Sequence, residues 1–268
     1  MFTNFLITFR EGLEAALIIG IILAYLTKIN RKEYFKHVFA GAGFGFLLSG
    51  IGAYLFETFI GGFEGTAEQI FEGSVMLVAV IMLTFMLVWM NKQSKNLSGD
   101  LSEKINLAIG KNQIWALATL AFVSIIREGI EVVLFMGATM HNSPSRFAIM
   151  GAILGLTCAI LLAWLILRST VNINLGKFFK YSGLFIILIA AGMLSGSVHE
   201  LEEAGVLPII ISHVWDITSF LNNESGIGVF LKAVFGYQPA PSLSEIASYV
   251  VYLSTSLFLY LKPSNRKM

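Results

Sequence analysis

The sequence contains one charged pentapeptide twice, as REGLE at residues 10–14 and as REGIE at residues 127–131. On a helix, two glutamates three residues apart share a face, and the arginine lies on nearly the same face. The glycine between them removes a side chain and leaves room for a neighbouring backbone or an ion. Carboxylates are hard oxygen ligands that suit hard cations. The candidate metal ligands are Glu11, Glu14, Glu128 and Glu131.

Both copies lie inside apolar runs, at least about six residues from the ends of the helices that these runs predict, and therefore within the hydrocarbon of a bilayer. A charge at that depth costs several kcal/mol unless it is paired or hydrated, and such residues usually line a functional path. An arginine–glutamate clasp between two helices would explain one glutamate in each copy. It would leave a formal charge of −2, from two arginines and four glutamates, which protonation or a bound cation would relieve. The motifs alone leave both the ion site and the clasp open.

The elements that carry the motifs are long apolar blocks separated by short polar breaks. The 268 residues are 56% hydrophobic and only 13% charged, whereas a soluble domain carries roughly 25% charged residues. Most blocks reach the roughly 20 residues that a helix needs to cross a bilayer. The sequence therefore predicts an all-α polytopic membrane protein with seven transmembrane helices, at residues 4–27, 37–60, 70–90, 113–140, 147–167, 178–201 and 243–261.

Basic residues mark one side of the expected membrane. Fourteen of the eighteen lysines and arginines fall in the breaks after the first, third and fifth helices and in the C-terminal tail, whereas two fall in the other breaks and two in the motifs. The positive-inside rule places the basic breaks in the cytoplasm. We therefore expect the N-terminus outside and the C-terminus inside.

The two motifs are 117 residues apart, since 127 minus 10 is 117. They fall in the first and fourth helices, which cross the membrane in opposite directions. This pattern is typical of an inverted repeat of three plus three helices, in which corresponding helices meet near the midplane and build one site.

We expect residues 1–268 to form a single permease-like domain with repeat one at about 4–90, repeat two at about 113–203 and the seventh helix outside the repeat. The remaining stretch, at about 205–242, contains the apolar piece VLPIII, which is too short to span a bilayer. This stretch is expected to be a re-entrant or interfacial segment on the outer side.

Acidic residues gather at the outer ends of the expected helices. This follows either from the exclusion of basic residues or from an anionic vestibule that concentrates cations at a pore mouth. The candidates for cation access from outside are Glu64, Glu68, His199, Glu200, Glu202 and Glu203. A solvated helix end would explain the last four equally well.

The sequence contains none of the common motifs for zinc, di-iron or nucleotide chemistry. The chain has no His-Glu-x-x-His zinc motif, no Glu-x-x-His pair of di-iron bundles and no glycine-rich phosphate loop. No catalytic residue is assigned, and ATP-driven transport by this chain alone is not indicated. The single cysteine, Cys158, is expected to be a packing residue in a helix. The net charge of +1 indicates no nucleic-acid partner.

The two Arg-Glu-Gly-x-Glu copies, in the first and fourth of seven helices, resemble the signature of the oxidase-dependent iron transporter family, the Ftr-type permeases of fungi and the EfeU-type permeases of bacteria. The resemblance extends to FEG at residues 71–73, to HELEEAG after the sixth helix and to the stretch from WDIT to FGYQPAPS at residues 215–242. It covers almost the whole chain.

The resemblance implies a multi-pass transporter of the plasma membrane that imports iron, and not an enzyme. The four motif glutamates would handle the ion, Glu72 would assist them, and Arg10 and Arg127 would orient the carboxylates. Iron would be the transported substrate, either ferric or ferrous with oxidation by a partner, and no cofactor would stay bound. Many bacterial members carry a large extracytoplasmic N-terminal domain that this sequence does not show, so a separate extracytoplasmic iron-binding or iron-oxidising protein is an expected partner.

Two other functions stay open on the residues. The same glutamates would serve a permease or proton exchanger for another cation, such as lead or manganese. The second is an intramembrane metal-site enzyme or sensor. The missing histidine ligands and the inverted repeat argue against it. No oligomeric state is predicted.

Overall fold

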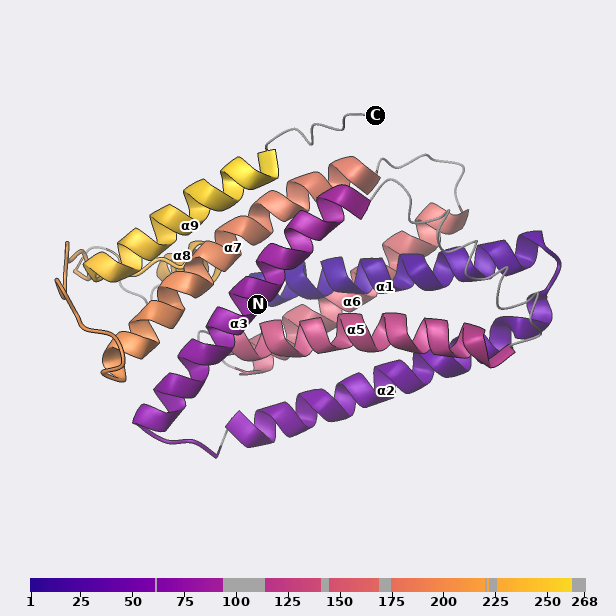
Figure 1. The fold of residues 1–268 in the computed structure, drawn as a ribbon, viewed down its shortest axis with the longest axis horizontal. Coiled ribbons are helices and arrows are strands. Elements are labelled where there is room, and N and C mark those ends of the chain that lie inside the picture. Colours follow the sequence, from indigo (N-terminus) through magenta and orange to yellow (C-terminus); the bar gives the residue numbers. More distant parts are fainter. Residues whose placement is uncertain are drawn as a thin grey trace.

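Figure 1 shows the computed structural model of the chain, in which residues 1–60, 62–93, 114–140, 145–168, 175–219, 221 and 226–261 are described. Every regular element within these residues is helical, which confirms the all-α prediction for them. The long helices are α1 (Phe2–Lys28), α2 (Phe35–Ile60), α3 (Thr66–Gln93), α5 (Ile114–Met140), α6 (Ser145–Arg168), α7 (Leu175–Glu203) and α9 (Leu243–Leu261), and the short ones are the 3₁₀ turn η1 (Lys32–Tyr34) and α8 (Gly226–Phe235).

The seven long helices coincide with the seven expected spans, with ends that differ by four residues at most. Successive long helices run in opposite directions along the molecule (Figure 1). One end, which we call the basic end, carries Lys28, Arg31, Lys32 and Arg168; the other, the acidic end, carries Glu57, Glu64, Glu68 and Glu203. Most of the third basic break, with Lys95, Lys104 and Lys111, and the C-terminal tail lie outside the described residues.

Four of the described helices, α2, α3, α6 and α7, are long and apolar enough to cross a membrane. In α1 and α5 the motif charges interrupt the apolar run. Large apolar side chains are exposed along the outside of the bundle, for example Phe46 of α2, Phe85 of α3 and Leu161 of α6. A surface this apolar is suited to lipid and not to water. Membrane crossing by all seven long helices stays a prediction.

The first six long helices pair across the two halves of the sequence. Helix α1 packs along α6 and α2 along α5, while α3 packs against α7 and α9 against α7. Glycines make the first two pairings close: Gly41 of α2 abuts the backbone of Ala118, and Gly151 of α6 abuts the backbone of Met1, so that a β-carbon at either glycine would overlap its neighbour. Small residues at such positions let helix backbones approach each other in a membrane.

Three apolar cores surround the motifs in the described part of the chain, and one of them is formed by Leu13 and Leu17 of α1 with Ala159 and Ala163 of α6. The largest one joins α1, α3, α5 and α7 around Met76, Leu83 and Phe135. Another lies towards the basic end, where α1, α2 and α5 meet, and consists of Ile22, Leu26, Val38, Leu117 and Ala121. The motifs in α1 and α5 are therefore held between packed, apolar regions.

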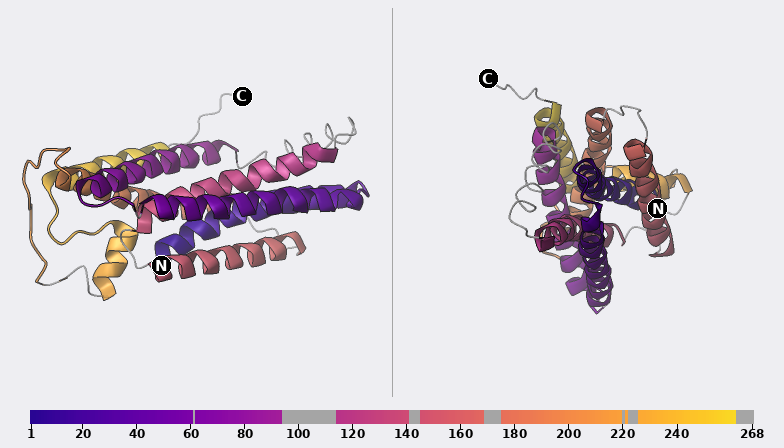
Figure 2. Two further views of the ribbon diagram at one scale, coloured as in Figure 1. Left: turned by 90° about the horizontal axis from the view of Figure 1, so that it is seen from below. Right: turned by 90° about the vertical axis from the view of Figure 1, so that its right-hand side faces the viewer.

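The segment between α7 and α9 is largely irregular. Helix α7 ends in a left-handed glycine, Gly205 (φ 73°), and the amide of Val206 returns to the carbonyl of Leu201, a common way to close a helix. Residues 206–217 are exposed, although many of them are apolar. Helix α8 follows and lies crosswise to the long helices beside the start of α1 (Figure 2). It has ten residues, too few to span a bilayer; part of the expected interfacial stretch, residues 222–225, lies outside the described residues.

The charge distribution predicts that the acidic end faces outwards. In a Cys158→Ala background, we expect Ser212→Cys to react with a membrane-impermeant maleimide added to intact cells and Lys32→Cys to react only after the membrane is permeabilised, since both positions are exposed and lie at opposite ends. Labelling of Lys32→Cys in intact cells would reverse the orientation.

Candidate metal-binding site

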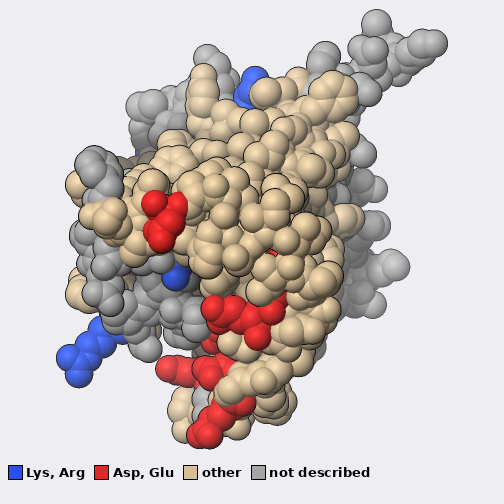
Figure 3. Space-filling model, turned by 90° about the vertical axis from the view of Figure 1, so that its left-hand side faces the viewer, with Lys and Arg blue, Asp and Glu red and all other residues tan. Residues whose placement is uncertain are grey.

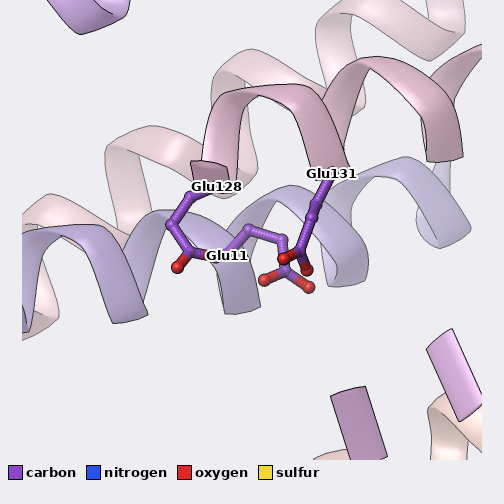
Figure 4. A group of neighbouring side chains, drawn as sticks. All are labelled: Glu11, Glu128 and Glu131. Carbon is purple, nitrogen blue, oxygen red and sulfur yellow. The ribbon is translucent and has the colours of Figure 1, made fainter. Parts of the chain in front are cut away.

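Three glutamates from the two motifs meet where α1 and α5 cross. Glu11 of α1 and Glu128 and Glu131 of α5 each place a carboxylate oxygen within 4.8 Å of the others'. Figure 4 shows the two α5 side chains reaching towards α1, where the carboxylate of Glu131 faces that of Glu11. We call these three residues the carboxylate cluster. It was expected from the motif spacing that both helices would contribute carboxylates to one place.

The carboxylate cluster is buried. The exposed fractions of Glu11, Glu128 and Glu131 are 0%, 4% and 7%. One oxygen of each carboxylate, Oε2 in all three, has no hydrogen-bond partner among the described residues. A buried carboxylate oxygen without a partner carries a desolvation penalty of about 1–3 kcal/mol or more, and three of them in one place require a neutralising group such as a proton or a cation.

Each motif arginine contacts the glutamates of its own helix. Arg10 Nη1 lies 2.6 Å from Glu11 Oε1, and Arg10 Nη2 lies 2.9 Å from Glu14 Oε1. Arg127 Nε lies 3.2 Å from Glu131 Oε1 and 3.8 Å from Glu128. Both arginines therefore lie where they can orient carboxylates, as the family resemblance implies.

The two arginines differ sharply in burial. The side chain of Arg10 is 2% exposed and also donates to the sulfur of Met86 in α3. The side chain of Arg127 is 44% exposed. Burial makes the ion pairs of Arg10 much more sensitive to the loss of a partner than those of Arg127.

Two further residues assigned from the sequence lie outside the carboxylate cluster. Glu14 is in the ion pair with Arg10 and is not one of the three residues whose oxygens lie within 4.8 Å of each other. Glu72 is half-buried in α3, next to Gly73, whose carbonyl accepts a hydrogen bond from Ser197 of α7. Of the four glutamates expected to bind the ion, three therefore lie close together, while Glu14 and the expected helper Glu72 lie outside this group.

The carboxylate cluster can bind a hard cation but is not suited to soft ones. Its ligand atoms are all carboxylate oxygens, which suit divalent and trivalent hard or borderline ions and disfavour copper(I). With both arginines ionised, the four motif glutamates carry a formal excess of two negative charges. A divalent cation would neutralise it.

A cavity of about 270 Å³ lies at the acidic end, between α1, α5, α7 and α8. Its walls include His199, Glu200 and Glu203 of α7 and Lys232 of α8, and its inner part includes Asn4 of α1. Burial lowers the pKa of Lys232, and the carboxylate of Glu200 acts in the opposite direction. The cavity brings together three of the six residues that were candidates for cation access.

The other three access candidates lie elsewhere at the acidic end. Glu64 is exposed in the turn before α3, Glu68 is in the first turn of α3, and Glu202 is buried outside the cavity wall. Figure 3 looks onto this end and shows acidic side chains gathered in the lower part of the face. The acidic character of this end is therefore a property of the folded surface as well as of the sequence.

Sequence reasoning missed the residues that hold His199 and those that form the inner part of the cavity. Glu245 of α9 is 2% exposed, and its Oε1 lies 3.1 Å from His199 Nδ1. Its position is set by a reciprocal pair of hydrogen bonds with Ser242, for which the spacing Ser-x-x-Glu before an apolar run was an available signal. The buried Asn4 and Thr139, which share a hydrogen bond, had no comparable signal.

Comparison with known proteins gives one consistent result. The model of the iron permease FTR1 family matches residues 1–264. The chain is 40% identical over 266 residues to the "Ferrous iron permease EfeU" of Yersinia pestis, which covers 98% of this chain and 94% of that protein. The protein of the same name from Escherichia coli O6:H1 is 36% identical over 266 residues, with 98% and 96% coverage. No solved structure matches the chain.

Proposed function

The chain belongs to the iron permease FTR1 family, and we propose that it imports iron, as the ferrous ion, across the plasma membrane through the carboxylate cluster. The observation that carries the proposal is the cluster itself: Glu11, Glu128 and Glu131 are buried, and each keeps one oxygen without a hydrogen-bond partner among the described residues. The similar proteins in Yersinia and Escherichia are named ferrous iron permeases, and we extend that substrate to this chain.

A clasp of arginines and glutamates accounts for only part of this geometry. Arg10 contacts Glu11 and Glu14 of its own helix, and Arg127 contacts Glu128 and Glu131 of its own helix. Each of these four ion pairs lies within one helix, and weaker electrostatic attraction also reaches across the two helices, from Arg10 to Glu131 and from Arg127 to Glu14. The clasp leaves the carboxylates of Glu11, Glu128 and Glu131 facing one another across the two helices, and these repel unless a proton or a cation is shared between them.

Close contacts support the inverted repeat. A shift of 117 relates Gly12 to Gly129, and a shift of 110 relates Ser49 of α2 to Ala159 of α6. A β-carbon at Gly12 would meet Ala159, and a β-carbon at Gly129 would meet Ser49. The contacts of Gly41 with Ala118 and of Gly151 with Met1 obey the same two shifts, since 41 plus 110 is 151 and 118 minus 117 is 1. Two half-structures related in this way would build the ion site from α1 and α5.

The acidic end supplies the route by which iron would reach the cluster. Its surface acids raise the local concentration of cations, and the cavity lined by Glu200 and Glu203 extends inwards to Asn4 of α1. A separate extracytoplasmic protein that binds or oxidises iron would deliver its cargo here.

Uptake of radioactive iron into cells that lack their own iron importers tests the proposal. Expression of the chain is expected to increase uptake of ascorbate-reduced iron well above the empty-vector level, and a membrane-impermeant ferrous chelator should suppress the increase. Excess manganese or lead should compete weakly. Accumulation of manganese or lead without iron would assign the chain to the other cation class, and equal uptake with and without the chain would contradict the proposal.

A further inference from the structure

A column of polar side chains lies on one face of α1 and leads from the cavity to the carboxylate cluster. Asn4, Thr8 and Glu11 are spaced four and three residues apart and therefore share one face of the helix. Their exposed fractions are 2%, 5% and 0%. Asn4 lies about 10 Å above Glu11 along the helix axis, with Thr8 midway, by the usual rise per residue.

The partners of Asn4 and Thr8 are incomplete. Thr139 Oγ1 lies 2.6 Å from Asn4 Oδ1, and both residues line the cavity. Among the described residues, Asn4 Nδ2 and Thr8 Oγ1 have no hydrogen-bond partner. Orphaned buried polar groups are rare in proteins, and each one calls for a bound species or an alternative arrangement.

One rearrangement of the amide satisfies the orphaned donor. Thr139 has a single hydroxyl proton, and the carbonyl oxygens of Phe135 and Met136 lie 3.1 and 3.0 Å from its Oγ1. When the proton is donated to either carbonyl, a 180° turn of the Asn4 amide lets Nδ2 donate to Thr139 Oγ1. That turn leaves Asn4 Oδ1 without a hydrogen bond to Thr139, so that it can coordinate a cation from the cavity. The amide oxygen and the hydroxyl of Thr8 then form a line of neutral oxygens that leads towards Glu11.

The repeat provides an internal comparison for these residues. The shift of 117 relates Asn4 to Ala121, Thr8 to Ile125 and Thr139 to Ile22. All three counterparts are apolar, and Ala121 and Ile22 belong to the core near the basic end. Packing of α1 against its partners therefore does not require polar residues at these positions. The polarity is confined to the side of the cluster that faces the acidic end.

We propose that Asn4, Thr8 and Thr139 form a relay of neutral oxygens that binds a divalent cation from the cavity and passes it to Glu11. Amide and hydroxyl oxygens replace part of the hydration shell of a hard cation without adding charge. Binding at such a station is weak enough for the ion to leave, which conduction requires. This inference rests on the proposed function, because it places the relay before the carboxylate cluster.

Purified protein in liposomes, with ferrous iron as the probe, tests the relay. Thr8→Val keeps the shape and removes the oxygen, so the initial rate of iron uptake is expected to fall about tenfold, which corresponds to the loss of one buried polar interaction. Thr8→Ser keeps the oxygen and should retain most of the rate. A purely structural role predicts the reverse order, since valine fills the site and serine leaves a gap. Thr157→Val is the matched control, because Thr157 is exposed on α6 and its hydroxyl bonds only to its own helix in the described structure.

Equilibrium binding of iron to the same proteins separates this inference from the proposed function. Thr8→Val and Asn4→Leu should bind iron with the parental stoichiometry while they transport it slowly. Parental transport rates in both variants would overturn the relay and leave the carboxylate cluster intact. If Glu11→Gln also transports iron at the parental rate, the proposed function itself fails.

Discussion

Glu11→Gln is expected to lower iron uptake by about 100-fold, because a charged ligand lost at a buried site costs roughly 3 kcal/mol. Glu11 is fully buried, and one of its oxygens faces the carboxylates of α5 without a hydrogen-bond partner in the described part of the chain. Glutamine keeps the volume and removes one negative charge. The folded protein should be as abundant as the parent, because Arg10 keeps its ion pair with Glu14 and the substitution relieves repulsion among the three carboxylates. Initial uptake rates, normalised to the amount of folded protein in the membrane, provide the measurement.

Glu33→Gln is the matched control for this prediction. Glu33 is exposed near the basic end, where it pairs with Arg31, and the same chemical change there should leave uptake unaltered. The clasp hypothesis expects a different result at Glu11, namely a loss of folded protein and normal transport by whatever remains. Folded Glu11→Gln protein that imports iron as fast as the parent would contradict the ion site.

Arg10→Met is expected to destabilise the protein far more than Arg127→Met, although the two arginines occupy the same position in the two motifs. Removal of Arg10 leaves Glu11 and Glu14 buried without their counter-charge, which costs about 3–5 kcal/mol. The melting temperature in detergent should fall on the order of 10 °C for a chain of this size. Arg127 lies 3.2 Å from Glu131 and 3.8 Å from Glu128, so its removal takes away weaker charge contacts than the removal of Arg10.

The comparison of the two arginine variants contains its own control, since the substitution is identical and only the surroundings of the arginine differ. Arg10→Lys should recover part of the stability but not the transport rate, because an ammonium group cannot hold the carboxylates of Glu11 and Glu14 as a planar guanidinium does. Equal melting temperatures for Arg10→Met and Arg127→Met would show that the burial of Arg10 carries no electrostatic consequence.

The long helices were predictable from the sequence because each one is an apolar block of sufficient length between polar breaks. The approach of Glu11 to Glu128 and Glu131 was also expected, since the motifs fall in two helices of opposite direction. The first inference depends on a pattern within one helix, which is set by local spacing, and the second adds the alternating direction of successive membrane helices.

Differences between the two motifs were not predictable. Glu14 pairs with Arg10, whereas its counterpart Glu131 joins the carboxylate cluster. Arg10 is buried beside Met86 of α3, and Arg127 is not. The third helices of the two halves also pack unequally, α3 against α5 more extensively than α7 against α1, and tertiary contacts of this kind leave no trace in the spacing of the motif. The role of Asn4 is hidden for the same reason.

Location of the bound ion is the most direct test of the carboxylate cluster as the iron site. Anomalous scattering at the iron edge, from crystals of the parent protein loaded with ferrous iron, should show its strongest peak within the helices between Glu11, Glu128 and Glu131, and the peak should be absent in Glu11→Gln. A strongest peak at any other place within the transmembrane helices, retained in Glu11→Gln, would contradict this account.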